Sequence, residues 1–549
     1  MRRHKKQVSN AERNTYDYVV VGGGSAGCVL ANRLSADPSI SVLLLEAGLP
    51  DRSVYIHIPA GLMLLSEKYD WRYKAEPDAS RNSIDDTWAA GKVLGGGSSI
   101  NAMLWVRGHP ADYDGWSKAG CVGWDYESVL PYFVKAETYE RPGGPLRGTS
   151  GPQHVSHIRG MHPLTYSFIQ AAVQAGHPFN ADYNGASQEG VAHAQLSQWN
   201  GLRYSTARAY LRPARRRSNL TVRTSALVHR VGIVGGRATG VDYTLNGKSH
   251  WARAEREVVV SAGALASPKI LMLSGIGPAA ELAKHDIPVV VDSRDVGQNL
   301  QEHPYVMLSW HVDTPTLNLE VTPWDFVRHG LDYVFRRQGP GASPLVHALL
   351  FGHIDADSDA CDVQATFSPI AFRSRGLDPG SLHEVHDMLL HDRSAVNVLP
   401  CVLHPEGRGA VTLRSANPAD PIRIDHEVIG RTRDLDLLAK TVGMMRAIMA
   451  APAMAKHVID ERMPGPGVET IDDIRQWLHT STIRGEHPVG TCRMGSDDDS
   501  VVDPGLRVRG VEGLRVADAS VFPTLTSGNP NAPVIMVGEK VADLILCNA

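Results

Sequence analysis

Three glycines near the start of the chain have the spacing of a phosphate-binding turn. Gly22, Gly24 and Gly27 fill the three positions of G-x-G-x-x-G, directly after an apolar strand expected over 16–21. The first permits a tight turn, the second lets a pyrophosphate approach the backbone, and the third lets the following helix pack on the strand. Glu46 ends the next apolar strand, where a carboxylate accepts hydrogen bonds from a ribose. The order predicts a dinucleotide-binding turn without separating FAD from NAD.

A histidine and two asparagines near the C-terminus have side chains suited to proton transfer and to orienting an oxygen. His487 stands in a turn fixed by Pro488, and Asn529 and Asn531 flank Pro530. A neutral imidazole accepts a proton, whereas an amide donates a hydrogen bond without titrating. The chain has 24 histidines, so the turn around His487 and not the residue type distinguishes it. Such a pair could deprotonate and orient a hydroxyl group.

Composition and charge exclude several classes of protein. The 549 residues predict two or more domains, and the net charge of −4 argues against a nucleic-acid partner. The six cysteines form no C-x-x-C pair, and no metal site is expected. No apolar run is long enough to span a membrane and no signal-peptide stretch follows the start, which predicts a cytoplasmic protein. The basic segment Met1–Lys6 is expected to be a solvated tail, with peripheral contact to the inner membrane as the alternative.

Further motifs carry a family resemblance. These motifs are a second glycine-rich loop, Gly91–Asn101, with Arg107, Pro110 and Asp114, the segments Gly263–Gly277 and Val296–Pro304, and the run His487–Leu546. Through them the sequence resembles the glucose–methanol–choline (GMC) family of FAD-dependent oxidoreductases, closest to its bacterial choline and alcohol dehydrogenase-like members. The resemblance covers nearly the whole chain from Tyr16.

The resemblance implies an activity and its reactants. It implies oxidation of a small alcohol, expected to be primary, to the aldehyde by hydride transfer to the flavin, with His487 as the general base. Asn529 is expected to orient the substrate oxygen, and Asn531 is the competing assignment. The expected electron acceptor is a quinone-type molecule. The alternatives are an oxidase that uses O2 in the same chemistry, and a non-redox hydroxynitrile lyase that contains FAD.

The resemblance and the glycine motif together give the expected FAD contacts. Val228 is the expected backbone contact of the adenine, with packing in an edge strand as the alternative. The full set comprises Gly22, Gly24, Ser25, Ala26, Gly27, Glu46, Ala47, Gly95, Ser99, Asn101, Ala102, Met103, Val228, Asp518, Ala519, Asn529, Pro530 and Asn531.

Three positions call for separate expectations. Some family members attach FAD through a histidine where Ile100 stands here, and Ile100 predicts that FAD is bound non-covalently. Glu486 replaces the apolar residue that often precedes the catalytic histidine, and we expect it to face solvent. The alternative is that it turns toward His487 and raises its basicity. His303 lies in a family stretch and is expected to have a structural role near the cofactor.

The expected fold is α/β, or α+β overall, with a Rossmann-like FAD-binding domain and a second domain of antiparallel sheet and helices that binds the substrate. The FAD domain is expected to comprise 15–160, 200–310 and 484–549, and the substrate domain 311–483. The pattern of alternating residues predicts antiparallel strands at 410–414 and 422–425. Other local expectations are a two-residue turn at Asn246-Gly247, a helix capped by Ser267 that begins at Pro268, a helix over Leu435–Met449 and a lid over Pro315–Pro340. The identity of the alcohol and the oligomeric state are not predicted.

Overall fold

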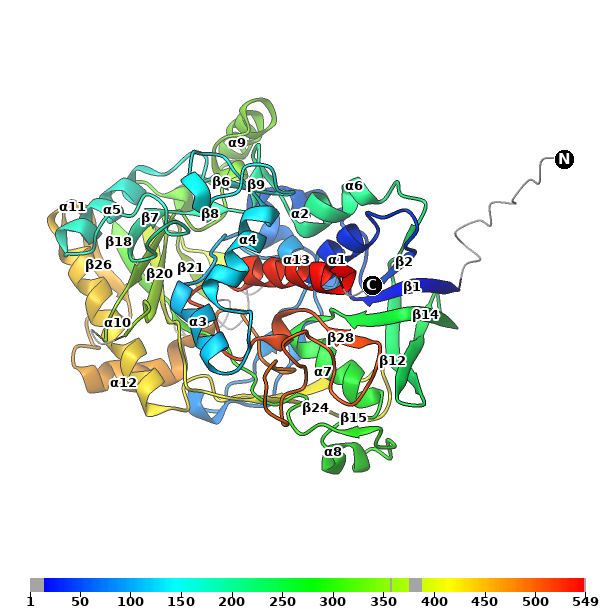
Figure 1. Cartoon of the computed structure of the whole chain (residues 1–549). Helices are drawn as coiled ribbons and strands as arrows, with labels where there is room; N and C mark the ends of the chain where they lie inside the picture. Colours follow the sequence, from blue (N-terminus) through cyan, green and yellow to red (C-terminus); the bar gives the residue numbers. More distant parts are fainter. Residues whose placement is uncertain (1–13, 356–357, 375–387, 548–549) are drawn as a thin grey trace.

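A computed structural model describes residues 14–355, 358–374 and 388–547. The basic segment Met1–Lys6 lies outside the described residues. Two sheets organise the chain, and they lie at opposite ends of the molecule in Figure 1.

The first sheet is mixed, and its parallel part carries the glycine motif. Its path is β11-β2-β1-β14-β13-β12, with β28 paired to β14. The strands β11, β2, β1, β14 and β28 run parallel, whereas β12 and β13 form antiparallel pairs. The bounds are β1 Thr15–Val21, β2 Val42–Leu45, β11 Leu220–Arg223, β12 Ala226–Val234, β13 Arg237–Leu245, β14 Lys248–Val260 and β28 Leu514–Val516.

The N- and C-terminal parts of the chain complete one another in this domain. Helix α13 (Asn531–Cys547) lies against α1 (Ser25–Leu34), as the red and blue ribbons show in Figure 1. A Cβ atom at Gly538 would come within 3.0 Å of the Val29 Cβ atom, so glycine allows the two helices to approach this closely. The two helices and the parallel strands share one hydrophobic core.

The second sheet is antiparallel, with the path β26-β18-β23-β20-β19-β7 and additional pairs to β17 and β27. It draws strands from outside 311–483 as well as inside it. The bounds are β7 Gly190–His193, β17 Pro304–Val306, β18 Leu308–Val312, β19 Ala348–Gly352, β20 Val363–Ser368, β23 Ala395–Val402, β26 Val458–Met463 and β27 Thr482–Arg484. A mixed sheet with its helices and a separate antiparallel sheet confirm the predicted fold class.

The alternation of residues in β20 decides which side chains reach the cavity described below. Phe367 points to the helices that cover one face and stacks on Phe168 with ring centroids 4.4 Å apart. Its neighbours Thr366 and Ser368 point to the other face and line the cavity. The helices on the covered face are α5 (Pro163–Gln174), α10 (Thr432–Ala450), α11 (Pro452–Ala455) and α12 (Ile471–Ser481).

Most of the local expectations are confirmed. Asn246 and Gly247 both have positive φ and join β13 to β14. Strands β24 (Ala410–Leu413) and β25 (Ile422–Asp425) pair antiparallel, and α10 contains the helix predicted over Leu435–Met449.

The start of one helix differs from the prediction. Helix α7 spans Gly263–Leu273, so Ser267 is not its cap and Pro268 lies inside it. Proline cannot donate the hydrogen bond that the Ala264 carbonyl would normally accept. The Thr491 hydroxyl donates to that carbonyl instead, which explains why the helix continues through the proline.

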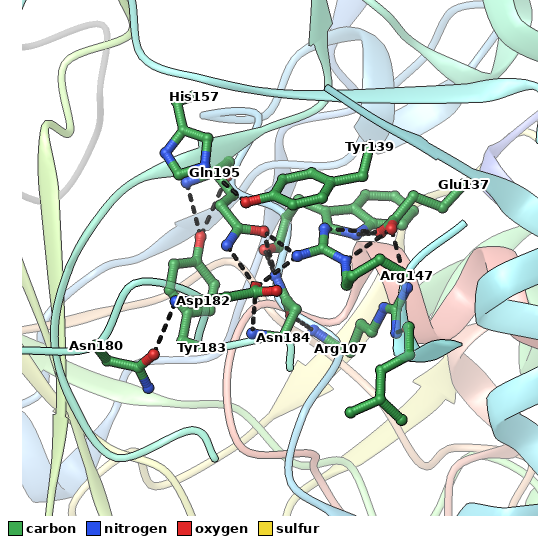
Figure 2. Close-up of polar contacts among 12 residues, drawn as sticks. Arg107, Glu137, Tyr139, Arg147, His157, Asn180, Asp182, Tyr183, Asn184 and Gln195 are labelled. Atoms are coloured by element: carbon green, nitrogen blue, oxygen red, sulfur yellow. Dashed lines mark hydrogen bonds and ion pairs between the residues drawn. The ribbon is translucent and has the colours of Figure 1, made fainter. Parts of the chain in front are cut away.

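A buried polar network holds the loop that contains the family residue Arg107 (Figure 2). The Arg147 guanidinium donates to both carboxylate oxygens of Glu137, at 2.8 and 3.1 Å. Arg107 forms an ion pair with the same carboxylate at 3.0 Å, and the Trp105 indole N–H donates to it at 2.8 Å. The Asp182 carboxylate forms an ion pair with Nη1 of Arg147.

The other elements are short or peripheral. The segment 315–340, expected as a lid, contains η7 (Leu317–Leu319) and α9 (Pro323–Arg336), and η8 (Pro340–Ala342) begins at its last residue. The other helices include α2 (Val54–His57), η1 (Pro59–Leu64), α3 (Pro110–Lys118), α4 (Tyr126–Ala136), α6 (Arg212–Ala214) and α8 (Ala279–Ala283). The short strands are β3 Tyr73–Lys74, β4 Thr87–Trp88, β5 Glu137–Tyr139, β6 Gln153–His157, β8 Gln195–Leu196, β9 Gln198–Trp199, β10 Leu202–Arg203, β15 Ile276–Gly277, β16 Val291–Asp292, β21 Phe372–Ser374 and β22 Met388–Leu390.

Candidate active site

A cavity of about 580 Å³ has walls from both sheets. Its size falls in the range of about 300–1,000 Å³ that small-molecule and cofactor sites occupy. One end is lined by the glycine-rich turn and the start of α13, and the other by strands of the antiparallel sheet.

The glycine-rich turn shapes the first end. Gly22 has a φ of 100°, and a Cβ atom there would lie 2.3 Å from the Ser261 carbonyl oxygen. Gly24 is the N-cap of α1 and supplies no capping side chain, which leaves the first N–H groups of the helix without that partner. Gly22, Gly24, Ser25 and Ala26 all line the cavity. Free N–H groups at a helix N-terminus suit a pyrophosphate.

Three of the residues expected to contact FAD lie behind the cavity wall. A Cβ atom at Gly27 would come 1.9 Å from the Gly22 carbonyl oxygen, so this glycine allows the turn to pack on α1. The Gly95 N–H donates to the Gly23 carbonyl at 2.7 Å and joins the two glycine-rich loops. The Ser99 hydroxyl donates to the Leu94 carbonyl at 2.7 Å.

Glu46 lines the cavity together with its neighbour Ala47. Its two carboxylate oxygens accept hydrogen bonds from the backbone N–H groups of Gly23 and Gly48, at 2.7 and 2.6 Å. Burial raises the pKa of Glu46 to about 7. Val228, the expected adenine neighbour, lies in the same wall.

The two competing asparagines have different surroundings. Asn531 begins α13, and its Oδ1 atom accepts a hydrogen bond from the Ser25 hydroxyl at 2.7 Å. Its buried Nδ2 atom has no hydrogen-bond partner among the described residues, so a donor remains at the glycine-rich end. Asn529 instead lies beside His487, with 2.9 Å between Asn529 Nδ2 and His487 Nε2.

The remaining expected FAD contacts line the cavity. Asp518 is held in place because its carboxylate accepts from the Gly263 N–H at 2.8 Å and from the Ser267 hydroxyl at 2.6 Å. Asn101 accepts from Arg203 at 2.7 Å. The remaining expected FAD contacts in the cavity wall are Asn101, Ala102, Met103, Asp518, Ala519 and Pro530. Ile100 lies in the same wall. The close glycine turn, the free N–H groups and the orphaned Asn531 amide fit a dinucleotide such as FAD.

His487 lies where the two ends of the cavity meet. It lines the cavity but is only 7% exposed. Burial lowers the pKa of His487 to about 3, so its imidazole is neutral at neutral pH. Its Nδ1 atom lies 2.9 Å from the Nδ1 atom of His303.

The hydrogen bonds of His303 determine which nitrogen of His487 carries the proton. His303 Nε2 lies 2.9 Å from the Leu403 carbonyl oxygen, and because a carbonyl only accepts, this nitrogen carries hydrogen. Burial, together with the adjacent His487, holds the pKa of His303 well below its usual range, so its Nδ1 atom is an acceptor. His487 Nδ1 must then donate, which leaves His487 Nε2 as an acceptor, and its lone pair faces the Asn529 Nδ2 donor at 2.9 Å.

Glu302 fixes the backbone of both histidines, a feature that the sequence did not reveal. The Glu302 carboxylate accepts from the backbone N–H of His487 at 2.9 Å and from that of His303 at 2.8 Å. Burial raises the pKa of Glu302 to about 8. The family stretch around His303 was the only signal in the sequence that pointed to this residue.

Glu486 does not face solvent as expected, and it does not turn toward His487. It lines the cavity, and its carboxylate accepts from the Ala89 N–H at 3.0 Å and from Arg484 at 2.9 Å. Arg484 in turn donates to Asp86 at 2.6 and 2.7 Å. The buried guanidinium holds the glutamate in the wall.

The end of the cavity beyond His487 is formed by the antiparallel sheet and the chain that follows η8. Asn397 contributes a buried Oδ1 atom without a partner among the described residues. The side chains that form this end are uncharged, although Arg484 and Glu486 line the cavity beside Ile483 and His487. The uncharged side chains are Tyr305, Met307, Leu345, Val346, Thr366, Ser368, Phe372, Asn397, Leu399 and Ile483.

Comparison with known proteins places the chain in one family. Models of the GMC oxidoreductase match residues 16–305 and 405–538. The chain is 40% identical over 540 residues to the "Alcohol dehydrogenase [acceptor]" of Pseudomonas putida, covering 97% of this chain and 96% of the relative. It is 40% identical over 552 residues to the mitochondrial choline dehydrogenase of Mus musculus, covering 98% of this chain and 91% of the relative.

A solved structure agrees with these matches. The pyridoxine 4-oxidase from Mesorbium loti superposes with a TM-score of 0.86 at 30% identity, over 96% of this chain and 98% of that one. Both family models and full-length relatives therefore agree with the resemblance seen in the sequence. The chain belongs to the GMC oxidoreductase family of FAD-dependent enzymes that act on CH–OH donors.

Proposed function

We propose that this protein oxidises an uncharged primary alcohol to the aldehyde, with His487 as the general base. The observation that carries the proposal is the chain of contacts from Leu403 through His303 to His487, which leaves Nε2 without a proton. Its lone pair accepts from Asn529 Nδ2, and the substrate hydroxyl would take the place of this contact. A base in this position takes the hydroxyl proton, and the resulting alkoxide releases hydride far more readily than the alcohol does.

Asn529 has the role of orienting the substrate oxygen. Its Oδ1 atom accepts from Gln364 at 3.2 Å, and this bond directs the Nδ2 donor toward His487. A hydroxyl group that reaches His487 Nε2 therefore also reaches an amide donor. Asn531, which contacts Ser25 of the glycine-rich turn, belongs to the cofactor end in this proposal.

Residues of the glycine-rich end would hold FAD, with Asn531 and the start of α13 beside it. When bound, FAD supplies the acceptor for the hydride of the carbinol carbon, so proton and hydride together leave an aldehyde. Because Ile100 has no nucleophile, we propose that FAD is held without a covalent bond. Acid precipitation should then release all of the flavin, and flavin that stays on the precipitated chain would contradict this part.

The lining of the cavity end beyond His487 supports an uncharged substrate. The apolar side chains of Met307, Leu345 and Leu399 suit a hydrocarbon tail, and Thr366 and Ser368 offer weak polar contacts. The carboxylate of Glu486 in the neighbouring wall is already paired with Arg484. Moving a quaternary ammonium group here from water would therefore be unfavourable for want of a free countercharge. We therefore favour a primary alcohol with an apolar tail over choline, the substrate named for the mouse relative.

The proposed electron acceptor is a quinone-type molecule. The name of the Pseudomonas putida relative specifies an electron acceptor, which supports transfer of the electrons to a separate acceptor molecule. An oxidase is the rival, and the two differ in how fast the reduced enzyme responds to air. Reduced enzyme that reoxidises rapidly with a soluble quinone and slowly with O2 supports the proposal, and the reverse order supports an oxidase.

One experiment tests the activity. Purified holoenzyme is mixed anaerobically with 1-hexanol, 2-hexanol, choline or a cyanohydrin, and the flavin absorbance is followed. We expect 1-hexanol to bleach the flavin fastest. Fastest bleaching by choline would overturn the choice of substrate but not the reaction. Cleavage of the cyanohydrin while no alcohol bleaches the flavin would establish a hydroxynitrile lyase, which could use the same base.

A further inference from the structure

Helix α9 directs its apolar face away from the protein. Trp324 is 73% exposed and Phe335 is 79% exposed, unusually high values for large apolar side chains. Five of the exposed apolar side chains recur at helical spacing and form one stripe, which consists of Trp324, Val327, Leu331, Val334 and Phe335. A sixth, Phe326, is 65% exposed and lies toward the opposite face. In Figure 1 the helix stands out from the edge of the molecule. We call these five residues the α9 stripe.

The orientation of the helix is fixed by a contact on the opposite side. Tyr333 is its buried residue, and the Tyr333 hydroxyl donates to the Gly201 carbonyl at 3.1 Å. At 100° per residue, Tyr333 lies opposite Trp324 around the helix axis. The charged side chains lie between the two faces, where Arg336 pairs with Asp332. An amphipathic helix of a globular protein normally buries its apolar stripe, and here that stripe points outward.

A group of arginines adjoins the buried side of the helix. Arg208 lies close enough to Tyr333 for an electrostatic interaction. It lines a surface depression together with Arg52, Arg212 and Arg215, three residues that are exposed, and with one acidic residue, Asp51. We call Arg52, Arg208, Arg212 and Arg215 the arginine group. An apolar stripe beside a cationic group has the chemistry that an anionic lipid surface requires.

The same region adjoins the cavity. After α9 the chain passes through η8 to Leu345 and Val346, which lie in the cavity wall. The segment η8 packs against η1, in which Leu62 lines the cavity while Leu64 is 64% exposed. A surface bound to α9 would therefore lie close to one wall of the active-site cavity.

We propose that α9 is an interfacial membrane anchor. The helix lies in the plane of an anionic bilayer, with the α9 stripe in the boundary between headgroups and acyl chains and the arginine group on the lipid phosphates. Tryptophan and phenylalanine on such a face are typical of helices that lie in this boundary. None of the helices in the described part of the chain is long and apolar enough to cross a membrane.

The experiment measures partition of the full-length holoenzyme onto vesicles of phosphatidylcholine with phosphatidylglycerol, and onto vesicles of phosphatidylcholine alone. The test variant carries Trp324→Gln, Leu331→Gln and Phe335→Gln. The matched control carries Val122→Gln, Val234→Gln and Ile459→Gln. The exposed fractions of these three apolar side chains are similar to those of the test residues, and they lie elsewhere on the surface. We expect the test variant to partition at least about 10-fold more weakly onto both kinds of vesicle, and the control to match the wild type.

A second variant separates the arginine group from the α9 stripe. Arg52→Gln with Arg212→Gln and Arg215→Gln should weaken binding to the anionic vesicles at least about 10-fold and leave binding to phosphatidylcholine alone unchanged. In the wild type, lipids brominated in their acyl chains should quench part of the tryptophan fluorescence. Trp324→Phe should remove the quenched component while the protein still binds.

Two results would overturn the proposal. One is a test variant that binds vesicles as the wild type does. The other is a wild type that does not bind vesicles but is a dimer in dilute solution, together with a test variant that is a monomer. That result would make the α9 stripe a contact between copies of the chain. Flavin absorbance and thermal unfolding that match the wild type show that each variant is folded.

Discussion

The Nδ1 atoms of His303 and His487 lie 2.9 Å apart, although the residues are separated by 184 positions in the sequence. Because His303 donates through Nε2 to the Leu403 carbonyl, it can only accept from His487. The pair therefore holds His487 in the form whose Nε2 atom can take a proton. His303 is a positioning residue in this account, since it does not line the cavity.

Replacing His303 should slow proton removal without emptying the cofactor site. We expect His303→Ala to lower the anaerobic rate of flavin reduction at least about 10-fold, because His487 is then free to adopt the other tautomer. The KM for the alcohol should change little. His303→Asn, whose side-chain oxygen can accept from His487, should restore part of the rate. Equal loss in both variants would point to a packing defect.

The two asparagines should behave differently. Asn529→Ala removes a donor beside His487 Nε2 and should lower the rate of flavin reduction while FAD stays bound. Asn531→Ala removes the partner of Ser25 and should weaken FAD retention instead. Flavin content after dialysis and the single-turnover rate, measured on both variants, separate the roles. Interchanged results would make Asn531 the residue that contacts the substrate.

The pH dependence follows from burial of the base. Only neutral His487 accepts a proton, so activity exists above its pKa and is lost as the pH falls through that value, about 3. The rate should therefore show no transition from His487 near pH 6.5. A transition near pH 7 would come from Glu486 or Glu46, because burial raises the pKa of each to about 7, and Glu486→Gln or Glu46→Gln should remove it. A transition near 6.5 that persists in both Glu486→Gln and Glu46→Gln would contradict the low pKa of His487.

Asp86 should matter for stability because it joins two buried guanidinium groups. Burial acts to raise the pKa of Asp86, but Arg484 and Arg81 outweigh it and lower the pKa to about 2. Asp86→Asn leaves both arginines without full compensation and should lower the free energy of unfolding by about 3–5 kcal/mol. The stabilisation is fully present above the ordinary pKa of 3.8 and is lost as the pH falls toward 2.

Thermal and denaturant unfolding of Asp86→Asn measure this effect. The exposed neighbour Asp85 provides the control, since Asp85→Asn should leave stability within about 0.5 kcal/mol of the wild type. Similar losses in the two variants would show that the Asp86 pair contributes little.

Features that depend on neighbouring residues could be predicted from the sequence. The glycine motif, the two-residue turn at Asn246 and the strands of β24 and β25 depend on spacing within a few residues, and the structure has them as predicted. The mixed and antiparallel sheets could be predicted because the family motifs extend over most of the chain.

Features that depend on distant partners could not be predicted. Pro268 indicates a helix start, but α7 begins earlier, at Gly263. The helix continues through the proline because the Thr491 hydroxyl, far along the chain, donates to the Ala264 carbonyl. Glu486 indicates a surface position until its ion pair with Arg484 is known. The segment of α9 was expected only as part of a lid, and the side to which its stripe points could not be predicted because that depends on the bond from Tyr333 to Gly201.

The anaerobic rate of flavin reduction in His487→Ala shows whether His487 removes the hydroxyl proton. The variant should keep its FAD and its thermal unfolding temperature, and it should reduce flavin about 10²–10⁴-fold more slowly than the wild type with the same alcohol. His250→Ala, which changes a histidine on the hairpin of the mixed sheet, should match the wild type. A His487→Ala enzyme that retains FAD and reduces it at the wild-type rate would show that another group removes the proton.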